Sequence, residues 1–365
     1  MHSDDLSPGD VIISRMDELV ATALRKQYDN ESDTWDPFGE PGYRKSLRDS
    51  RYHFSYLAES MKVNSPELFK DYVGWVKILF AGLDFPRTVP VTTLKCMMVS
   101  IREHLDERTV KEASRYFEAA LEYLPNVSCT TASHIRSDTY LGKLATDYLT
   151  YLLNHDSSGA EEMILQALED GTDLRDIYLK VLQPCQYELG RLWQISRITV
   201  EQEHYCTEVT GRIMSRICRG AINADPEKIG RRFVAAAIGG ELHGTGIRMV
   251  TDFMEMAGWE TLYLGANTPA DGIVRACCNF DADLLGLSTT ISFHIGDVKD
   301  LIRRVREAEP RNWLGIMVGG YPFNLDEKLW REVGADGFGR DADEAVRVAG
   351  KLTGIPGQSP PDRVS

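Results

Sequence analysis

FVAAAIGGELHGTG, at residues 233–246, joins an uninterrupted apolar run to a polar loop that is rich in glycine. Such a run predicts a strand buried on both faces, as in a parallel sheet that helices cover on each side. The alternation of an apolar run with an amphipathic segment then repeats four more times, and the last segment begins at Asp341. The sequence therefore predicts an α/β region with a doubly wound, five-stranded parallel sheet of the flavodoxin-like kind.

The change of period at about residue 225 also marks a domain boundary. Strands are expected at 233–240, 260–264, 282–288, 314–320 and 336–339, and helices at 247–257, after Pro269, at 297–307, at 324–332 and from Asp341. Upstream, apolar residues recur three and four apart, the helical period. We expect an amphipathic helix at 8–27, a polar arm at 29–45, an N-terminal helical domain at 1–128, a four-helix bundle at 129–224, the sheet domain at 225–353 and a disordered tail at 354–365.

Composition excludes several classes of protein. The chain carries 55 acidic and 41 basic residues, a net charge of −14, and no basic patch that would displace phosphate counterions, so nucleic-acid binding is not expected. Seven scattered cysteines form no CxxC pair, which points to reduced thiols rather than to zinc or disulfides. The first ten residues lack a signal-peptide pattern and no apolar run could span a membrane, so a cytoplasmic location is expected.

Three unusual loops follow strands of the predicted sheet, at 240–246, 288–292 and 319–321. Ligands of open α/β sheets bind beyond the carboxyl ends of the strands, where these loops meet. The first loop places His243 two residues after Glu241. A surface histidine and tight glycine turns are the simpler reading of each loop alone, and a phosphate loop is opposed by the absence of GxxxxGK[ST] and GxGxxG. The three loops together favour a ligand site.

This order of motifs, ExHxxG, a serine-rich loop and then Gly-Gly, resembles the cobalamin-binding signature of methionine synthase, corrinoid carrier proteins and light-sensing cobalamin repressors. The resemblance extends over about residues 130–350. It implies that His243 is the lower axial cobalt ligand and that Glu241 accepts its other imidazole N–H. It further implies cobalamin contacts, with room for the nucleotide tail, at Leu242, Gly244, Thr245, Gly246, Ser288, Thr290, Ser292, Gly319, Gly320 and Tyr321.

GRLWQISRITVEQEH, at 190–204, resembles the upper-face signature of the light-sensing repressors. The resemblance implies that Trp193 covers the upper ligand and that Glu203 and His204 contact an adenosyl group. A core tryptophan with a solvated Glu-His pair is the simpler alternative. One departure is Gln194, because the repressors carry a histidine there that ligates cobalt after illumination. His204, another residue or water would have to take that role.

The acidic, aromatic-rich N-terminal domain replaces the DNA-binding head of those repressors. It diffusely resembles the heads of photocobilins, cobalamin photoreceptors that also hold a bilin. Biliverdin would bind without a covalent link where this domain meets the bundle and the corrin, beside Arg51, His53, Tyr56 and Trp75, with His104 or His134 as further candidates. A dimerisation domain with an ordinary aromatic core is the competing interpretation.

The resemblance therefore implies a cobalamin-dependent photoreceptor, a light sensor rather than an enzyme. Light would cleave the Co–C bond of adenosylcobalamin, move the bundle relative to the sheet, and signal to a partner or through a changed homodimer. The alternative is a corrinoid methyl carrier of a methyltransferase system. A radical mutase is excluded because its substrate barrel has no counterpart in this sequence.

Overall fold

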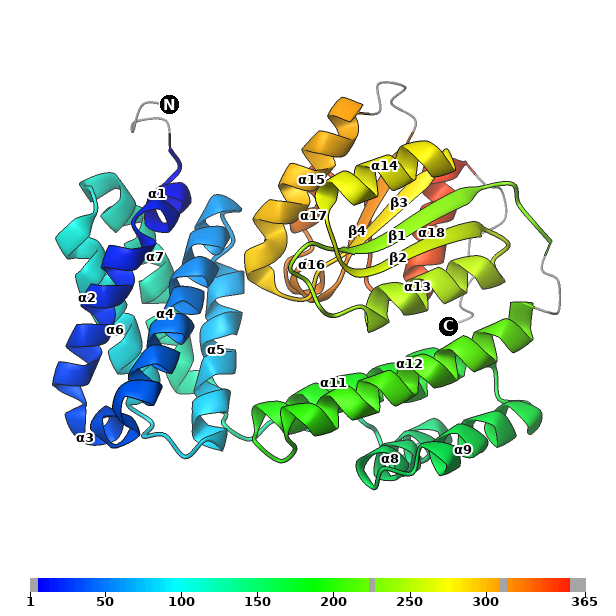
Figure 1. Ribbon diagram of the computed structural model, residues 1–365, viewed down its shortest axis with the longest axis horizontal. Helices are drawn as coiled ribbons and strands as arrows, with labels where there is room; N and C mark the ends of the chain where they lie inside the picture. The colour runs from blue at the N-terminus through cyan, green and yellow to red at the C-terminus, as the bar shows by residue number, and fades with distance from the viewer. Residues whose placement is uncertain (1–5, 223–226, 309–313, 355–365) are drawn as a thin grey trace. The chain divides into compact units, whose positions relative to one another are not determined.

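The computed structural model describes residues 6–222, 227–308 and 314–354, so the predicted tail lies, apart from Gly354, outside the described residues. The chain divides into two compact units. The first comprises Met1–Thr131 with two short segments, Gln194–Ser196 and Ser292–Gly296. The second comprises the remainder, which holds both the bundle and the sheet (Figure 1). None of the described helices combines the length and the apolar character that crossing a membrane requires.

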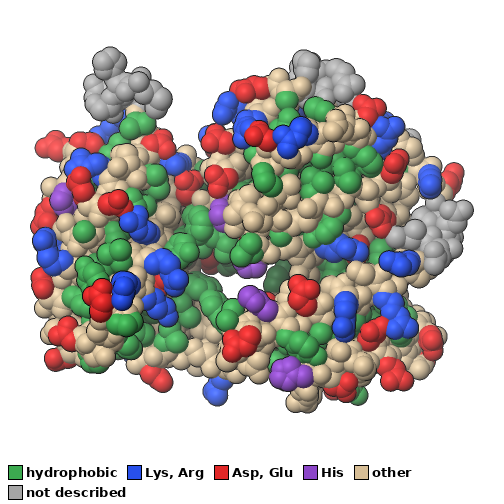
Figure 2. All heavy atoms as spheres, in the orientation of Figure 1, with side chains coloured by type: hydrophobic (Ala, Val, Ile, Leu, Met, Phe, Trp, Pro, Cys, Tyr) green, Lys and Arg blue, Asp and Glu red, His purple; other side chains and the backbone are tan. Residues whose placement is uncertain are grey.

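The first unit is helical. Its helices are α1 (Pro8–Ser14), α2 (Met16–Asn30), α3 (Ser32–Trp35), α4 (Gly39–Lys62), α5 (Pro66–Gly82), α6 (Val89–His104) and α7 (Glu107–Tyr123). Large rings at Phe54, Phe69, Tyr116 and Phe117 are almost fully buried among them. At an average transfer energy, each ring contributes about 2–3 kcal/mol to the stability of this core. On the face in Figure 2, acidic and basic side chains are interspersed over these helices.

Two expectations for this unit were wrong in detail. The single helix expected at 8–27 is interrupted at Arg15, where the backbone leaves helical geometry (φ −110°). The polar arm expected at 29–45 is largely helical, because aromatic contacts hold it in place. Trp35 is 7% exposed and packs between the rings of Tyr28 and Phe85, with centroids 5.6 and 5.2 Å away.

The second unit begins with the bundle, whose helices are α8 (Tyr140–Leu153), α9 (Ser157–Glu169), α10 (Leu174–Ile177), α11 (Gln183–Gln194) and α12 (Val200–Ile222). Side chains of Thr139, Asp156 and Asp173 accept backbone N–H groups at the starts of α8, α9 and α10, which defines those ends. Residues 178–182 form a π-helix, so α10 and α11 continue into one another.

The sheet contains β1 (Arg232–Ile238), β2 (Glu260–Thr268), β3 (Leu284–Ser288), β4 (Gly315–Gly319) and β5 (Gly337–Gly339), all parallel, in the order β2-β1-β3-β4-β5. The predicted five-stranded fold is confirmed. The helices that follow the strands are α13 (Thr245–Met256), α14 (Ala270–Phe280), α15 (Ile295–Ala308), α16 (Tyr321–Leu325), α17 (Leu329–Glu332) and α18 (Ala342–Thr353). Figure 1 shows α13 and α18 on one face of the sheet and α14 and α15 on the other.

The helix expected at 324–332 is instead two short helices, α16 and α17. Asp326 ends α16 with an extended backbone, and its side chain accepts the N–H of Lys328 at 3.1 Å. Such local bonds from aspartate compete with the helical pattern, which explains the break.

One hydrophobic core joins the bundle to the sheet domain. It includes Tyr178 of the π-helix, Met214 of α12, Phe253 of α13 and Phe233 of β1, each fully buried. Helix α13 packs on α12 on one side and on the sheet on the other. The loop at 239–244, which directly precedes α13, is therefore on the side of the sheet domain where the bundle packs.

Candidate functional site

The carboxyl ends of three neighbouring strands bring the predicted loops together. Ala237 of β1 pairs with Ser288 of β3, and Ser288 pairs with Gly319 of β4. The chain leaves β1 toward β2 on one side and returns to β3 on the other, so the crevice of this sheet opens between β1 and β3. The loops at 239–244 and 289–292 flank that point.

Glu241 and His243 form the centre of the site. His243 Nδ1 lies 2.5 Å from Glu241 Oε1, and the His243 backbone N–H donates to the same oxygen at 3.1 Å. Because the carboxylate can only accept, Nδ1 carries a proton, so in the neutral ring the lone pair is on Nε2. The imidazole is 57% exposed, whereas the carboxylate is fully buried. In the neutral ring this arrangement fixes the orientation of the imidazole and leaves Nε2 as the nitrogen that could bind a metal.

The second oxygen of Glu241 is held by the neighbouring loop. Its Oε2 accepts the backbone N–H of Thr290 at 2.7 Å, that of Ile291 at 3.0 Å and the hydroxyl of Thr289 at 3.1 Å. Thr289 was not singled out in the sequence, although it lies inside the run 288–292. Only the register of β1 against β3 shows that its hydroxyl faces Glu241.

These hydrogen bonds set the protonation states of the pair. Burial alone would raise the pKa of Glu241, but the bonds from His243, Ile291 and Thr290 outweigh it and lower that pKa to about 2. The hydrogen bond to Glu241 raises the pKa of His243 despite burial, and the negative charges of Glu241 and Glu203 add to the rise.

Two large side chains near the carboxyl ends of β1 and β4 are exposed. Leu242, on the loop after β1, is 74% exposed, and Tyr321, the first residue of α16, is 48% exposed. Gly246 has open space where a Cβ would stand. Gly320, in contrast, is required by the fold itself, because its φ is +103° and a Cβ would lie 2.0 Å from the carbonyl oxygen of Thr289. A flat apolar ligand bound at this edge would cover the exposed side chains of Leu242 and Tyr321.

The other predicted cofactor contacts are placed as follows. Gly244 and Thr245 stand at the start of α13, and Gly319 ends β4. Ser288 and Ser292, expected to hydrogen-bond the nucleotide tail, are 8% and 5% exposed, so both hydroxyls are largely enclosed by protein in this structure.

The upper-face residues lie on two helices of the same unit as His243. Trp193, at the end of α11, is 36% exposed, and the His204 side chain is 72% exposed on the first turns of α12. Glu203 Oε2 lies 3.7 Å from His204 Nε2. Gln194, which groups with the first unit, is 7% exposed and donates from Nε2 to the carbonyl of Trp75 at 3.0 Å. The Gln194 side chain is therefore buried and held by a backbone carbonyl.

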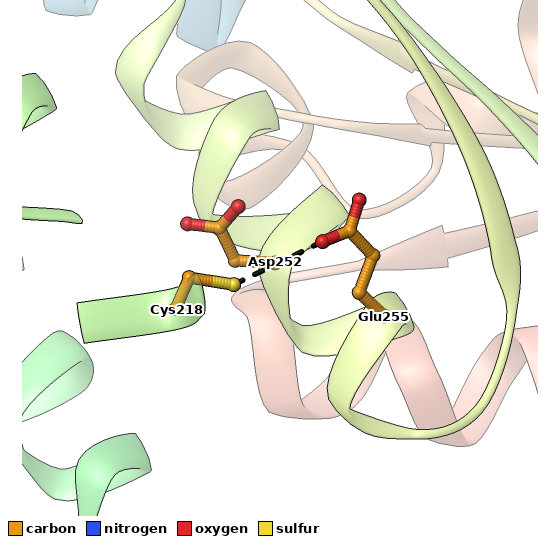
Figure 3. A group of neighbouring side chains, drawn as sticks. All are labelled: Cys218, Asp252 and Glu255. Carbon is orange, nitrogen blue, oxygen red and sulfur yellow. Dashed lines mark hydrogen bonds between the residues drawn. The ribbon is translucent and has the colours of Figure 1, made fainter. Parts of the chain in front are cut away.

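A second group of possible metal ligands lies between α12 and α13, where Cys218, Asp252 and Glu255 approach within 4.8 Å of one another (Figure 3). Each carboxylate oxygen already has a protein partner. Asp252 accepts from Arg248 Nε at 2.8 Å and Tyr178 OH at 2.7 Å, and Glu255 accepts from the Thr261 hydroxyl and, at 3.9 Å, from the Cys218 thiol. Burial, with the Asp252 and Glu255 charges, raises the pKa of Cys218 to about 12. This group is a protein-internal network rather than a metal site.

The four candidate bilin residues are split between separate contacts. Arg51 pairs with Asp17 at 2.6 Å, and Trp75 is 37% exposed on α5. His53 Nδ1 and the hydroxyl of Tyr72 are 2.6 Å apart, and Tyr56 stacks on the same tyrosine at 3.6 Å. Burial lowers the pKa of His53 to about 4, so its ring is neutral at pH 7. The cavity beside His53 measures about 10 Å³, which is room for about one water.

Replacing Glu241 by glutamine should destabilise the protein at neutral pH. A shift of the carboxyl pKa from 4.5 to about 2 corresponds to about 3 kcal/mol of folding free energy. Because the folded-state pKa is lowered, this stabilisation is complete above pH 4.5 and is lost as the pH falls toward 2. We expect urea unfolding to show a deficit in E241Q at pH 7 that shrinks below pH 4.5. Glu201→Gln, an exposed position on α12, is the control; an equal deficit there, or one independent of pH, would refute the assignment.

Two models of known families match this chain. Residues 231–347 match a family model described as a B12 binding domain, and residues 144–217 match a second model with the same description. The first covers the sheet with the Glu241–His243 loop, and the second covers most of the bundle. The chain is a cobalamin-binding protein, and the predicted cofactor class is confirmed.

Individual relatives fall into two kinds. A corrinoid protein of Desulfitobacterium hafniense is 30% identical over 124 residues, 34% of this chain and 56% of the relative. The HTH-type transcriptional repressor CarH of Myxococcus xanthus is 32% identical over 142 residues, 39% of this chain and 46% of the repressor. The chain thus spans about half the length of both. The solved structure of the Methanosarcina barkeri monomethylamine corrinoid protein has the same fold, with a TM-score of 0.51 at 22% identity, over 57% of this chain and 98% of that protein.

Proposed function

We propose that this protein is a cobalamin-dependent photoreceptor that holds adenosylcobalamin between the bundle and the sheet domain. Bound adenosylcobalamin supplies a cobalt–carbon bond that light can break. The chain would contribute His243 below the corrin, aimed by Glu241, and Trp193, Glu203 and His204 above it. The observation that carries the proposal is geometric: helix α12, which bears Glu203 and His204, packs on α13, and α13 directly follows the loop that carries Glu241 and His243.

The absorption spectrum of the purified protein tests this proposal. Loaded with adenosylcobalamin in the dark, the protein should keep one spectrum until green or blue light changes it. The illuminated protein should also differ from the dark protein in oligomeric state or in sensitivity to proteolysis, because a signal needs two conformations. A bound cobalamin whose illumination alters neither conformation nor assembly would refute the photoreceptor.

The alternative is a corrinoid methyl carrier, which the similarity to two corrinoid proteins supports. A carrier would accept a methyl group on cobalt and pass it to a second protein, independent of light. Turnover of methyl groups with a partner methyltransferase, together with a light response no different from that of free cobalamin, would favour the carrier.

Trp193 provides a sharper test of the upper face. We expect Trp193→Ala to lower the affinity for adenosylcobalamin about tenfold, because a covering ring of this size contributes about 1.5 kcal/mol or more. Coordination by His243, seen in the spectrum, should persist. Titrations of wild type and variant measure both quantities. Tyr187→Ala, which removes a half-exposed ring from the same helix, is the matched control, and equal losses from both variants would argue against a specific role of Trp193.

The proposal has three further parts. The first unit would bind a bilin, the protein would form a homodimer, and the light signal would pass to a partner protein that is not identified. Since the cavity beside His53 is small, biliverdin would require the packing around Tyr56 and Tyr72 to open. Titration of the cobalamin-loaded protein with biliverdin should give a saturable, red-shifted band that Tyr56→Ala alters. No spectral change at micromolar pigment would end this part of the proposal and leave an ordinary helical domain.

A further inference from the structure

A chain of hydrogen bonds connects Glu203 to the interior of the bundle. The Thr207 hydroxyl lies 2.8 Å from Glu203 Oε1 and 2.9 Å from Gln186 Oε1. The Gln186 amide in turn lies 3.0 Å from the Thr210 hydroxyl, and Tyr148 OH lies 2.9 Å from the same hydroxyl. Three helices contribute: α8 carries Tyr148, α11 carries Gln186, and α12 carries the rest.

The inner end of this chain is rigid and its outer end is accessible. Tyr148 and Thr210 are fully buried, whereas the Glu203 side chain is 29% exposed. The neighbouring His204, for comparison, is 72% exposed. A buried polar network whose members are all satisfied restricts side-chain rotation, so Glu203 is held in one orientation.

Counting protons gives the direction of these bonds. Thr207 has a single hydroxyl proton, and an ionised carboxylate is a stronger acceptor than an amide, so the proton goes to Glu203. Gln186 must then present its NH₂ group to Thr207, an orientation related by an amide flip. Thr210 donates to the Gln186 oxygen in place of Cys206 O, and Tyr148 donates to Thr210. Every donor then points toward the carboxylate, and successive bonds polarise one another.

We propose that Thr207, supported by Gln186 and Thr210, is a positioning residue that aims Glu203 at the upper ligand of the corrin and thereby selects an upper ligand that carries hydrogen-bond donors. This inference rests on the proposed function, because it takes Glu203 to face the upper ligand. A ribose with free hydroxyls can donate to an aimed carboxylate, whereas a methyl group cannot. The positioning of Glu203 therefore changes the relative affinity for the two cobalamins and does not change the coordination of cobalt by His243.

The test compares two probes, adenosylcobalamin and methylcobalamin, in spectroscopic titrations of the full chain in the dark. Thr207→Val keeps the shape of the side chain and removes its hydroxyl, and Thr207→Ser restores the hydroxyl. We expect T207V to bind adenosylcobalamin about tenfold more weakly, methylcobalamin within twofold of wild type, and T207S to recover most of the loss. Thr146→Val is the control, because that hydroxyl bonds only to the carbonyl of Gly142 within α8.

A double-mutant cycle with Glu203→Ala separates the possible failures. If Thr207 acts through Glu203, T207V should cost almost nothing in the E203A background. Equal weakening for both cobalamins, or an undiminished effect without Glu203, would overturn the positioning role and leave the upper site intact. If wild type and E203A bind both cobalamins with the same affinity, the upper site itself is wrong and the inference falls with it.

Discussion

Replacing His243 by alanine should lower the affinity for cobalamin by about 100-fold or more while leaving the protein folded. Removal of a residue that only orients a ligand costs 10–100-fold in metal sites, so loss of the ligand itself should cost at least the upper value. The fold should survive because the imidazole is 57% exposed and buried Glu241 keeps its three bonds to the loop at 289–291. Equilibrium titration measures the affinity, and the spectrum reports histidine coordination.

His134→Ala is the matched control for this experiment. That histidine is exposed in the same unit, and the substitution keeps its backbone N–H bond to Glu188. Thermal unfolding of all three proteins shows whether the fold is retained. Wild-type affinity with an unchanged cobalt spectrum in H243A would show that another residue ligates cobalt.

Replacing Asp252 by alanine should destabilise the second unit by about 1–3 kcal/mol, the usual cost of losing the hydrogen bonds of a buried side chain. Asp252 is 1% exposed and accepts hydrogen bonds from Arg248 Nε and from the hydroxyl of Tyr178. Its loss leaves the partly exposed guanidinium of Arg248 without this counterion and leaves the hydroxyl of Tyr178 with the longer bond to the carbonyl of Met214, at 3.2 Å. Urea unfolding followed by circular dichroism measures the change.

Two further variants separate charge from shape. Asp252→Asn retains the size of the side chain and should cost less than D252A, because its amide oxygen can still accept one of the two bonds. Asp147→Ala, at an exposed position on α8, should lie within about 0.5 kcal/mol of wild type. A loss in D252A no larger than in D147A would mean that the contact between bundle and sheet domain does not depend on this network.

The sequence predicted the parts of this site that are local in the chain. Glu241 and His243 are two residues apart on one loop, so their contact follows from the loop alone. The glycine-rich turns and the alternation of strands with helices were also accessible, because apolar runs and helical periods mark the elements and parallel strands place their loops at one edge. The interruption at Arg15 and the split at Asp326 were missed, because single backbone angles and local side-chain bonds decide them.

The amino-acid sequence by itself determined a five-stranded parallel sheet, a helical bundle before it and a histidine at the sheet edge, because each depends on residues close together in the chain. The cobalamin cofactor was implied by the resemblance of the loop motifs to a known family. Only the tertiary structure decided what holds those parts in place. Thr289 reaches Glu241 across 48 residues, and Tyr178 reaches Asp252 across 74. The Gln186–Thr207 pair joins two helices in the same way. Such contacts depend on strand register and on the rotation of each helix about its axis, and packing against the other elements sets both.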